Sequence, residues 1–356
     1  MRHTPSFTGL RAGYGRRKAL LSLALLAALS AGCAGSLGAQ DGSAPSPGGG
    51  YTLAAMGDIM LGTENLLPAD GARGFFADVK PYLAGRDIVF GNLEGPLTDR
   101  GSATKDTSTG RSFCFRTPPS YGDVLKDAGF NIVSLANNHA MDYGPEGRAQ
   151  TEEVLGALGI LHTGAPGQIT RASVRGRPFA FVGLAPNAGC QNINDVDAAA
   201  GLVREALRED PATLVIVSMH GGAEGAAHMR LPDGPETYLG ESRGDLRRLA
   251  RALIDAGAAM VIGHGPHVPR GAELYKGRLV AYSLGNFATA SGINVKGASG
   301  LAPLLLAEIA PDGSTGSYEF VSFRQQANRG PRLDPRNEAA ETIRRLSEEL
   351  EGGGGS

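Results

Sequence analysis

The sequence predicts a layered α/β fold, and three observations lead to this class. Short apolar segments typical of buried strands alternate with longer amphipathic segments typical of helices. Residues 311–314, Pro-Asp-Gly-Ser, lie between the last two expected strands and predict a hairpin, so part of a sheet should be antiparallel. The length of 356 residues, of which 42% are hydrophobic, suits one large α/β domain or two small ones. We expect a single large domain.

The strands and helices follow from the spacing of apolar residues. Residues 240–256 show a helical pattern, because Leu246, Leu249 and Leu253 fall on one face of a helix. Gly257 follows them, a common C-terminal stop. The other expected helices comprise residues 74–83, 120–128, 145–158 and 197–209. The expected strands comprise residues 53–56, 88–90, 132–135, 179–184, 214–219, 259–262, 278–283, 304–309 and 318–323.

The N-terminus has the pattern of an export signal. A basic stretch precedes the apolar residues 19–31, which are too few for a comfortable transmembrane helix but suit the core of a signal peptide. The run ends in Leu29-Ser30-Ala31-Gly32-Cys33, which resembles the lipobox of bacterial lipoproteins and implies acylation of Cys33. An ordinary secretory signal is the alternative. We expect a signal peptide at residues 1–33 and a membrane-anchored lipoprotein on the extracytoplasmic side, at the cell surface or in the periplasm.

The rest of the chain divides by composition. Residues 34–50 are rich in Gly, Ser, Pro and Ala without apolar periodicity, which predicts a flexible linker. The main domain is expected at residues 51–330. A C-terminal tail should follow at residues 331–356, with a short amphipathic helix through Ile343 and Leu346.

Charge and cysteine content narrow the class of function. The net charge is −2, so nothing in it favours a nucleic-acid partner. The three cysteines form no CxxC pair, which disfavours a thiolate zinc site. After export Cys114 and Cys190 would meet an oxidising compartment, and whether they pair is open.

Polar side chains stand where five of the expected strands end. The carboxyl ends of the strands of an α/β sheet share one edge, where ligands bind. Oxygen and imidazole groups that meet there are the ligands a divalent metal needs. Taken singly, each has a structural interpretation, such as a turn for Asp58 or a core position for His220. The residues concerned are Asp58, Glu94, Asn137, Asn138, His139, His220, Glu224, His264 and His267.

These segments resemble the motifs of the CapA family, whose members are associated with poly-γ-glutamate capsule synthesis, export or anchoring. The resemblance covers most of residues 51–323 in the right order. CapA proteins in turn resemble the calcineurin-like metallophosphoesterases. This resemblance implies a four-layer α/β/β/α sandwich with helices outside two sheets. The matching blocks are Gly57-Asp58-Ile59-Met60-Leu61-Gly62, Asn92-Leu93-Glu94, Ser134-Leu135-Ala136-Asn137-Asn138-His139, Gly263-His264-Gly265-Pro266-His267 and Tyr282-Ser283-Leu284-Gly285-Asn286-Phe287.

The resemblance implies a set of metal ligands. Asp58 matches the first aspartate of the metallophosphoesterase site, and His220 matches its lone histidine. Asn138 belongs to the Asn-His pair, and Glu94 supplies a carboxylate. His267 matches one histidine of the last motif. In this chain the two histidines of that motif, His264 and His267, are three residues apart rather than two.

Two positions depart from the metallophosphoesterase pattern. Met60 stands where the motif has a histidine, and a thioether prefers soft ions. Asn92 stands where an aspartate bridges two ions, which an amide cannot do as a carboxylate does. We therefore expect one divalent ion, of Mn, Zn, Fe or Mg, rather than a pair.

The remaining candidates would surround the substrate. His139 is expected to act as a catalytic acid that protonates the leaving group, with Asp142 orienting its imidazole. Four further residues are expected either to contact substrate or to hold the metal ligands in position through their own contacts. They are Asn92, Glu224, His264 and Asn286.

Three functions remain open. The first is a metal-dependent hydrolase or transferase that acts on poly-γ-glutamate or another anionic envelope polymer, within a capsule synthesis complex. The second is a non-catalytic component that binds a polyanion or a partner through a degenerate metal site, as Met60 and Asn92 would favour. The third, a conventional phosphoesterase, is disfavoured by the same two residues.

Overall fold

The computed structural model describes residues 35–37, 49–63, 66–107, 112–290 and 292–352. The expected signal peptide and the expected lipidation site at Cys33 lie outside these residues. In the described parts, no helix has both the length and the apolar character needed to span a membrane.

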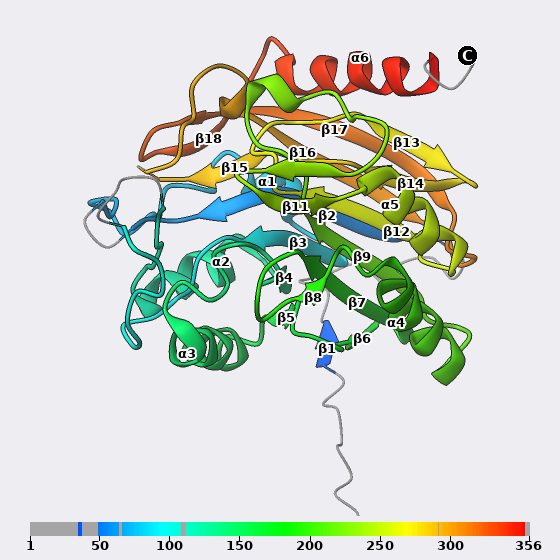
Figure 1. Cartoon of the computed structure of the whole chain (residues 1–356), viewed down its shortest axis with the longest axis horizontal. Helices are drawn as coiled ribbons and strands as arrows, with labels where there is room; N and C mark the ends of the chain where they lie inside the picture. Colours follow the sequence, from blue (N-terminus) through cyan, green and yellow to red (C-terminus); the bar gives the residue numbers. More distant parts are fainter. Residues whose placement is uncertain (1–34, 38–48, 64–65, 108–111, 291, 353–356) are drawn as a thin grey trace, which may run out of the picture. The chain divides into compact units, whose positions relative to one another are not determined.

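Two β-sheets form the middle of the domain (Figure 1). The first sheet has the order β18–β17–β16–β2–β3–β4–β5, with β15 beside β2. Its strands are β2 (Tyr51–Met60), β3 (Ile88–Leu93), β4 (Ile132–Ser134), β5 (Leu161–Thr163), β15 (Asn286–Thr289), β16 (Leu301–Ile309), β17 (Thr315–Gln326) and β18 (Gly330–Leu333). β2 to β5 run parallel, and β16 with β17 forms the predicted antiparallel hairpin.

The second sheet has the order β1–β6–β7–β9–β12–β14–β13, with β8 beside β7. Its strands are β1 (Gly35–Leu37), β6 (Thr170–Val174), β7 (Arg177–Ala185), β8 (Gln191–Asn192), β9 (Leu214–His220), β12 (Met260–His264), β13 (Ala272–Tyr275) and β14 (Arg278–Ala281). β7, β9, β12 and β14 run parallel in its centre. A separate two-stranded hairpin consists of β10 (Glu236–Tyr238) and β11 (Glu241–Gly244).

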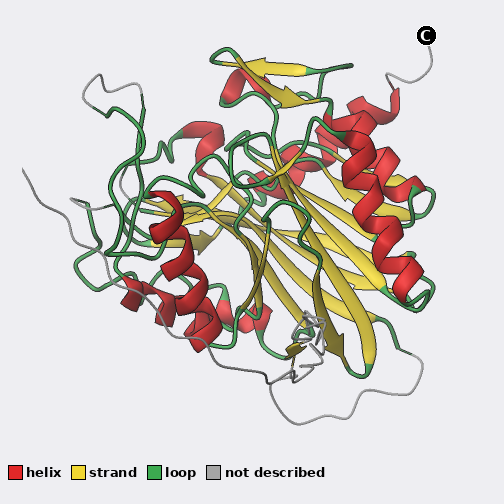
Figure 2. Cartoon of the chain, turned by 60° about the horizontal axis from the view of Figure 1, so that its bottom comes forward, coloured by secondary structure: helices red, strands yellow, loops and turns green. Residues whose placement is uncertain are grey.

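Helices lie on the outer faces of both sheets, as Figure 2 shows with strands in yellow and helices in red. The helices are α1 (Lys80–Leu83), α2 (Gly122–Ala128), α3 (Gly144–Ala157), α4 (Val196–Glu209), α5 (Leu246–Asp255) and α6 (Glu338–Gly352). Short 3₁₀ helices lie in the connections, namely η1 (Pro119–Tyr121), η2 (Ala226–His228) and η3 (Gly297–Gly300).

Hydrophobic cores separate the layers. Successive residues of β2 point to opposite faces, so that Ala54 packs toward α1 to α3 while Leu53 packs toward the second sheet. The opposite face of the second sheet, with Val217, packs against α4 and α5. The predicted four-layer α/β/β/α arrangement is confirmed by this packing.

Two expected helices differ in length. Only Lys80–Leu83 is helical in the segment expected at residues 74–83, and the residues before it form turns. In the segment expected at residues 240–256, β11 takes the first part and α5 begins at Leu246. The side chain of Asp245 accepts from the amide of Arg248 over 3.1 Å and caps α5 there.

Both ends of the expected domain need adjustment. The short strand β1 lies within residues 34–50, where we expected only linker. The boundary at residue 330 was placed too early, because β18 pairs with β17 and α6 packs on β17, β13 and β16. The predicted amphipathic helix is confirmed, with Ile343 and Leu346 buried.

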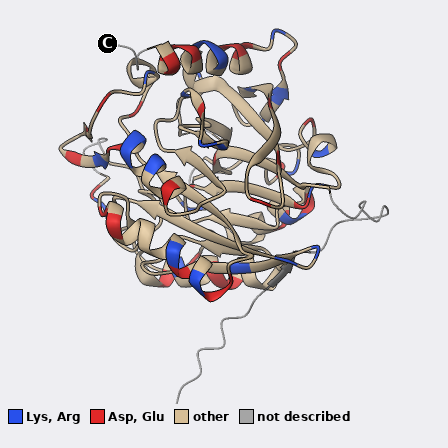
Figure 3. Cartoon of the chain, turned by 90° about the vertical axis from the view of Figure 1, so that its right-hand side faces the viewer, with Lys and Arg blue, Asp and Glu red and all other residues tan. Residues whose placement is uncertain are grey.

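Surface charges of both signs are interspersed, as Figure 3 shows along α6. Arg344 of this helix pairs with Glu341 and Glu348, and Arg345 pairs with Glu349. Such mixed exposed pairs contribute little to folding stability. They also fit the near-zero net charge of the chain.

Candidate metal centre

The ends of the central parallel strands bring distant residues together, because the register of the strand pairs places them side by side. Asp58 on β2 lies opposite Asn92 on β3 and opposite Asn286 on β15. In the second sheet, His264 on β12 lies opposite His220 on β9. β12 also contacts β2 between the sheets. Residues from both sheets therefore meet at one place.

Gly57 lets this end of β2 approach the loop that precedes β15. A side chain there has no space, since a Cβ at position 57 would lie 1.9 Å from the carbonyl oxygen of Gly285. The amide of Asp58 donates to the same carbonyl over 2.9 Å. The glycine in the Gly-Asp motif therefore fixes where the aspartate lies.

Asp58, Glu94 and His267 form a compact group of potential metal ligands. In the part of the chain that the structure describes, one ligand atom from each lies within 4.8 Å of the other two. Nε2 of His267 lies 3.5 Å from Oε1 of Glu94, and Nδ1 of His267 lies 3.1 Å from Oδ2 of Asp58. Two carboxylates and an imidazole are hard or borderline ligands that suit Mn, Zn, Fe or Mg.

The orientation of His267 is set by its own hydrogen bonds. Its Nδ1 faces Oδ2 of Asp58 and, over 3.0 Å, Oδ1 of Asn286, and both oxygens are acceptors. Nδ1 therefore donates, and Nε2 is left facing Glu94 and Glu224, whose Oε2 lies 3.8 Å away. The backbone φ of His267 is +58°, a strained conformation for a residue other than glycine that is concentrated at functional sites.

Asn92 and His264 lie against the other oxygen of Asp58, and His220 lies next to Asn92. Nδ2 of Asn92 donates to Oδ1 of Asp58 over 2.8 Å and lies 3.3 Å from Nδ1 of His220. Nδ1 of His264 lies 3.6 Å from the same Oδ1. Asn137 donates to Oδ1 of Asn92 over 3.1 Å, so both ends of the Asn92 amide are engaged. Asn92 therefore orients Asp58, and its own oxygen is held by Asn137.

The charge states follow from burial and from neighbouring charges. Burial opposes ionisation of Asp58, but the hydrogen bond from His267 and the nearby imidazoles lower the pKa of Asp58 to about 2. Burial also disfavours charged His267, but the carboxylates of Glu94 and Asp58 raise the pKa of His267 to about 10. Burial holds the pKa of His220 well below its usual value and lowers that of His264 to about 4. His220 and His264 are therefore neutral, as metal-binding imidazoles must be. His267 carries a proton on both nitrogens while no ion is bound, and it would lose the proton on Nε2 when it binds a metal.

Glu94 fits a bound cation. Both oxygens of its carboxyl group are buried without a hydrogen-bond partner among the described residues, and burial raises the pKa of Glu94 well above its usual value. Within the same residues, Nε2 of His220 and both ring nitrogens of His264 are buried and lack a partner too. A buried polar group without a partner costs of order 1–3 kcal/mol. A divalent ion bound by these oxygen and nitrogen atoms would remove that cost.

His139 stands beside this group, oriented by Asp142. Nδ1 of His139 donates to Oδ2 of Asp142 over 2.7 Å, and Nζ of Lys105 lies 2.6 Å from the other carboxylate oxygen. The amide of Phe115 donates to Oδ2 over 2.6 Å. Burial lowers the pKa of His139, although the hydrogen bond to Asp142 opposes this. His139 is therefore a neutral imidazole whose Nε2 is left to accept a proton.

An open cavity of about 380 Å³ lies against the candidate centre. His139 and His267 share its wall, so a molecule in the cavity would reach both imidazoles. Its lining comprises Lys105, Ser112, Phe113, Phe115, Asn138, His139, Asn187, Glu224, Tyr238, Leu239, Glu241, Arg243, His267, Gly292 and Ile293. We refer to it below as the site cavity.

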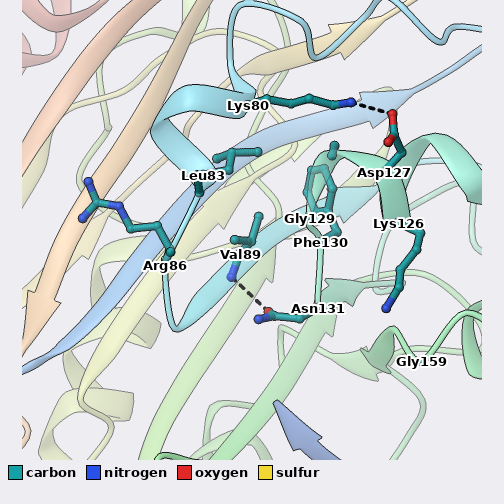
Figure 4. A pocket seen from close by; sticks show the side chains of 13 residues that line it. Lys80, Leu83, Arg86, Val89, Lys126, Asp127, Gly129, Phe130, Asn131 and Gly159 are labelled. Atoms are coloured by element: carbon teal, nitrogen blue, oxygen red, sulfur yellow. Dashed lines mark hydrogen bonds and ion pairs between the residues drawn. The ribbon is translucent and has the colours of Figure 1, made fainter. Parts of the chain in front are cut away.

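A second cavity, of about 370 Å³, lies beside the start of β3 (Figure 4). Its polar groups are satisfied locally. Lys80 pairs with Asp127, and the side chain of Asn131 accepts from the amide of Val89 over 3.0 Å. Among the described residues of its lining, no buried side-chain nitrogen or oxygen lacks a partner. The site cavity is therefore the better candidate for function.

The structure brings the residues singled out from the sequence to this one place. Asn138, expected as a ligand, lines the site cavity, and its Oδ1 is buried without a partner in the described chain. His264 and Asn286, expected in supporting roles, contact Asp58 and His267 directly. Met60 is buried at the end of β2. The roles of these residues in metal binding and catalysis stay predictions.

Three neighbours were not assigned roles from the sequence. Asn137 was named among the strand-end residues but, unlike Asn138 and His139 of the same motif, was given no role. Lys105 and Arg243 carry no local signal, because one lies in a loop and the other in a segment expected to be helical. The disulfide left open is absent, since within the described residues Cys114 and Cys190 are both free.

Asn137→Ala is expected to weaken metal binding roughly 10–100-fold, as loss of a residue that supports ligands typically does. Asn137 holds Asn92, donates to the carbonyl of Leu93 over 2.9 Å, and accepts from the amide of His139 over 3.0 Å. Competition between the protein and a chelator measures the affinity. Asn187→Ala removes an amide from the same cavity and is the control. Equal loss in both variants would contradict the role given to Asn137.

The chain is similar to known proteins over most of this domain. Residues 52–291 match the family model described as bacterial capsule synthesis protein PGA_cap. The PGA biosynthesis protein CapA of Bacillus subtilis (strain 168) is 31% identical over 252 residues, covering 65% of this chain and 61% of that protein. The capsule biosynthesis protein CapA of Bacillus anthracis is 29% identical over 258 residues, covering 66% and 59%. The chain thus spans about three fifths of the length of these relatives.

A solved structure, the 5'-nucleotidase precursor from Thermus thermophilus, can be superposed on 85% of this chain and 59% of its own. The TM-score is 0.43 and the sequence identity is 14%.

Proposed function

The chain belongs to the bacterial capsule synthesis protein family PGA_cap, and from this premise we propose that it acts on poly-γ-glutamate or another anionic envelope polymer through a metal-dependent hydrolase-like site. The proposal includes export and a lipid anchor at Cys33, which would hold the domain on the extracytoplasmic side of a membrane near a capsule synthesis complex. The shared family supports the action on an envelope polymer, and the motif at residues 29–33 supports export and the lipid anchor.

One observation carries the metal-dependent site. Glu94 is completely buried, and its carboxyl group has no hydrogen-bond partner among the residues that the structure describes. Its nearest cationic neighbour in the described chain is the His267 imidazole, whose Nε2 lies 3.5 Å from Oε1 of Glu94 without forming a hydrogen bond. A buried carboxylate without hydrogen bonds is unfavourable, and a closely bound cation would neutralise it more completely. Asp58 and His267 lie close enough to share such a cation with Glu94. His220 and His264 could supply neutral imidazoles from the other side of Asp58.

The metal, when bound, would polarise the carbonyl or phosphoryl group that is attacked. The other steps belong to side chains. His139 accepts a proton at Nε2 from the attacking water and returns it to the leaving group, since Asp142 occupies its Nδ1. For an amide bond, the water oxygen joins the carbonyl carbon, the C–N bond breaks, and the proton goes to the amine. The ring of Phe115, whose centre lies 4.2 Å from that of His139, packs against the imidazole.

Elemental analysis of the chain purified without chelator tests the metal. We expect close to one divalent ion per chain, because the Asn92 amide replaces the bridging carboxylate of a two-ion site. At a metal concentration about 100 times its Kd, the ion should stabilise the fold by about 2.7 kcal/mol, and a chelator should remove this gain. The unfolding midpoint in both conditions gives the measurement. A metal-free protein whose stability ignores the chelator would refute the site.

A non-catalytic role is the alternative that a specific observation favours. Both ends of the Asn92 amide are engaged by Asp58 and Asn137, so the chain lacks the carboxylate that a two-ion hydrolase would use. Size-exclusion chromatography of poly-γ-glutamate after incubation with the metal-loaded protein separates the two functions. Shortened polymer supports hydrolysis, whereas binding without shortening supports the alternative.

A further inference from the structure

Arg243 is a buried cation on the wall of the site cavity. It lies on β11, and only 4% of its side chain is exposed. Its Nη1 lies 3.1 Å from Oε1 of Glu224, and its Nη2 lies 3.1 Å from Oε2 of Glu241. The ring of Tyr238 lies 5.5 Å from the guanidinium carbon. A guanidinium offers five N–H donors, more than these two oxygens use.

Part of that donor capacity is unused. In the described residues, Nε and Nη1 of Arg243 are buried and form no hydrogen bond, although Nη1 is close to Glu224. The planar fork of an arginine binds carboxylate and phosphate groups through paired hydrogen bonds. Arg243 lines the site cavity, so an anionic group of a molecule there would lie beside this guanidinium.

Glu224 connects Arg243 to the candidate metal centre. One of its oxygens faces Arg243, and the other lies 3.8 Å from Nε2 of His267. The anion subsite and the metal centre are therefore separated by a single carboxylate. A substrate whose reacting bond is near His267 could place a neighbouring anionic group on Arg243.

The β10–β11 hairpin holds these groups at the cavity. Its two turn residues, Leu239 and Gly240, have φ values of +48° and +82°, as the favoured two-residue hairpin turns require. Leucine is poorly suited to that conformation, yet Leu239 is 79% exposed at the cavity edge. At the base of the hairpin, buried Glu236 forms two 2.7 Å contacts with Arg270. The hairpin is thus anchored firmly, and it contributes Tyr238, Leu239, Glu241 and Arg243 to the lining of the cavity.

We propose that Arg243, presented by the β10–β11 hairpin, is the subsite that recognises an anionic group of the substrate next to the scissile bond. This inference rests on the proposed function, because it assigns the substrate class of the same site. A carboxylate of a γ-linked glutamate chain or a phosphate group fits the same fork. The two sources are distinguished by the probes below.

Calorimetric titration of the metal-loaded chain tests the subsite with three probes. They are a γ-linked glutamate oligomer, the same oligomer with its carboxylates converted to amides, and inorganic phosphate. The wild-type chain should bind the acid oligomer at least tenfold more tightly than the amide form, roughly the difference expected for one charge-assisted contact. Arg243→Gln should lose this preference, and Arg243→Lys should retain part of it. Phosphate that binds through Arg243 while the oligomer does not would assign the subsite to phosphate.

Arg345→Gln, which removes an exposed guanidinium from α6, is the control and should keep the full preference. The thermal midpoint and metal content of each variant show whether it is folded and loaded. A wild-type chain that binds both oligomer forms equally, or an Arg243→Gln chain that still prefers the acid form, would overturn the subsite. Oligomer that binds through Arg243 but is never shortened would instead refute the hydrolysis alone.

Discussion

Glu94→Gln should stabilise the metal-free protein and abolish its response to metal. The metal-free wild type buries a carboxyl group that has no hydrogen-bond partner in the described chain, and burial raises its pKa well above the usual value. An uncharged amide of the same shape removes the cost of burying the charge, so where Glu94 is ionised the free energy of unfolding should rise by about 1–3 kcal/mol. Metal affinity should fall by more than the roughly 100-fold that follows loss of a supporting residue. Denaturant unfolding with and without metal measures both effects.

Glu236→Gln is the matched control for that experiment. Glu236 is also a buried carboxylate, but Arg270 and the amide of Ala223 satisfy its oxygens, at 2.7 Å and 2.9 Å. Breaking a buried ion pair is destabilising by about 3–5 kcal/mol, so the same substitution should have the opposite sign here. Metal binding should persist in the folded fraction. If Glu94→Gln destabilises the metal-free protein as Glu236→Gln does, then Glu94 has an undetected partner and the metal site loses its main support.

The opposite signs express a general relation between stability and function. A site that binds a cation must keep carboxylates and imidazoles close together before the ion arrives, which is unfavourable for the empty fold. In this chain Asn92 and His267 form hydrogen bonds to Asp58, whereas Glu94 has only the charge of His267, 3.5 Å away, and no hydrogen bond among the described residues. Of the two carboxylates, Glu94 is therefore the one whose burial a bound cation would stabilise most.

Much of the fold could be predicted because its strands are buried on both faces. A short continuous apolar run such as residues 214–219 is typical of a strand buried on both faces, and the structure has β9 there. The helix expected at residues 240–256 was too long, because the leucine spacing of α5 was extended through β11. Gly244 has a φ of +89° and Asp245 caps the helix, and these two signals mark its true start.

The candidate site was predictable only in part, for a physical reason. Residues at the ends of parallel strands converge whatever the connections between them, so the positions of Asp58 and His220 followed from the strand pattern. Arg243 and Lys105 reach the site from a hairpin and a loop, whose paths depend on tertiary packing. The pairing of Asn92 with Asp58 likewise depends on strand register, which apolar patterns alone do not give.

His139→Gln should lower turnover by about 10²–10⁴-fold and leave metal content unchanged. His139 lines the site cavity with its Nδ1 donating to Asp142, so Nε2 is the atom placed to transfer a proton. Glutamine fills a similar volume but cannot transfer that proton, whereas the Asp58, Glu94 and His267 group stays intact. The rate at which poly-γ-glutamate is shortened, together with elemental analysis of the same sample, gives both measurements.

Two further variants decide what a loss of turnover means. Asp142→Asn weakens the orientation of the His139 imidazole but keeps the imidazole itself, so this variant should lose less rate than His139→Gln. The substitution also disturbs the contacts of Asp142 with Lys105 and the amide of Phe115. His228→Gln, in η2, should leave turnover unchanged. If His139→Gln loses its metal together with its activity, His139 is a ligand and not the proton-transfer group. If turnover survives, proton transfer must come from another residue of the cavity, and Glu224 is the carboxylate of its lining that faces His267.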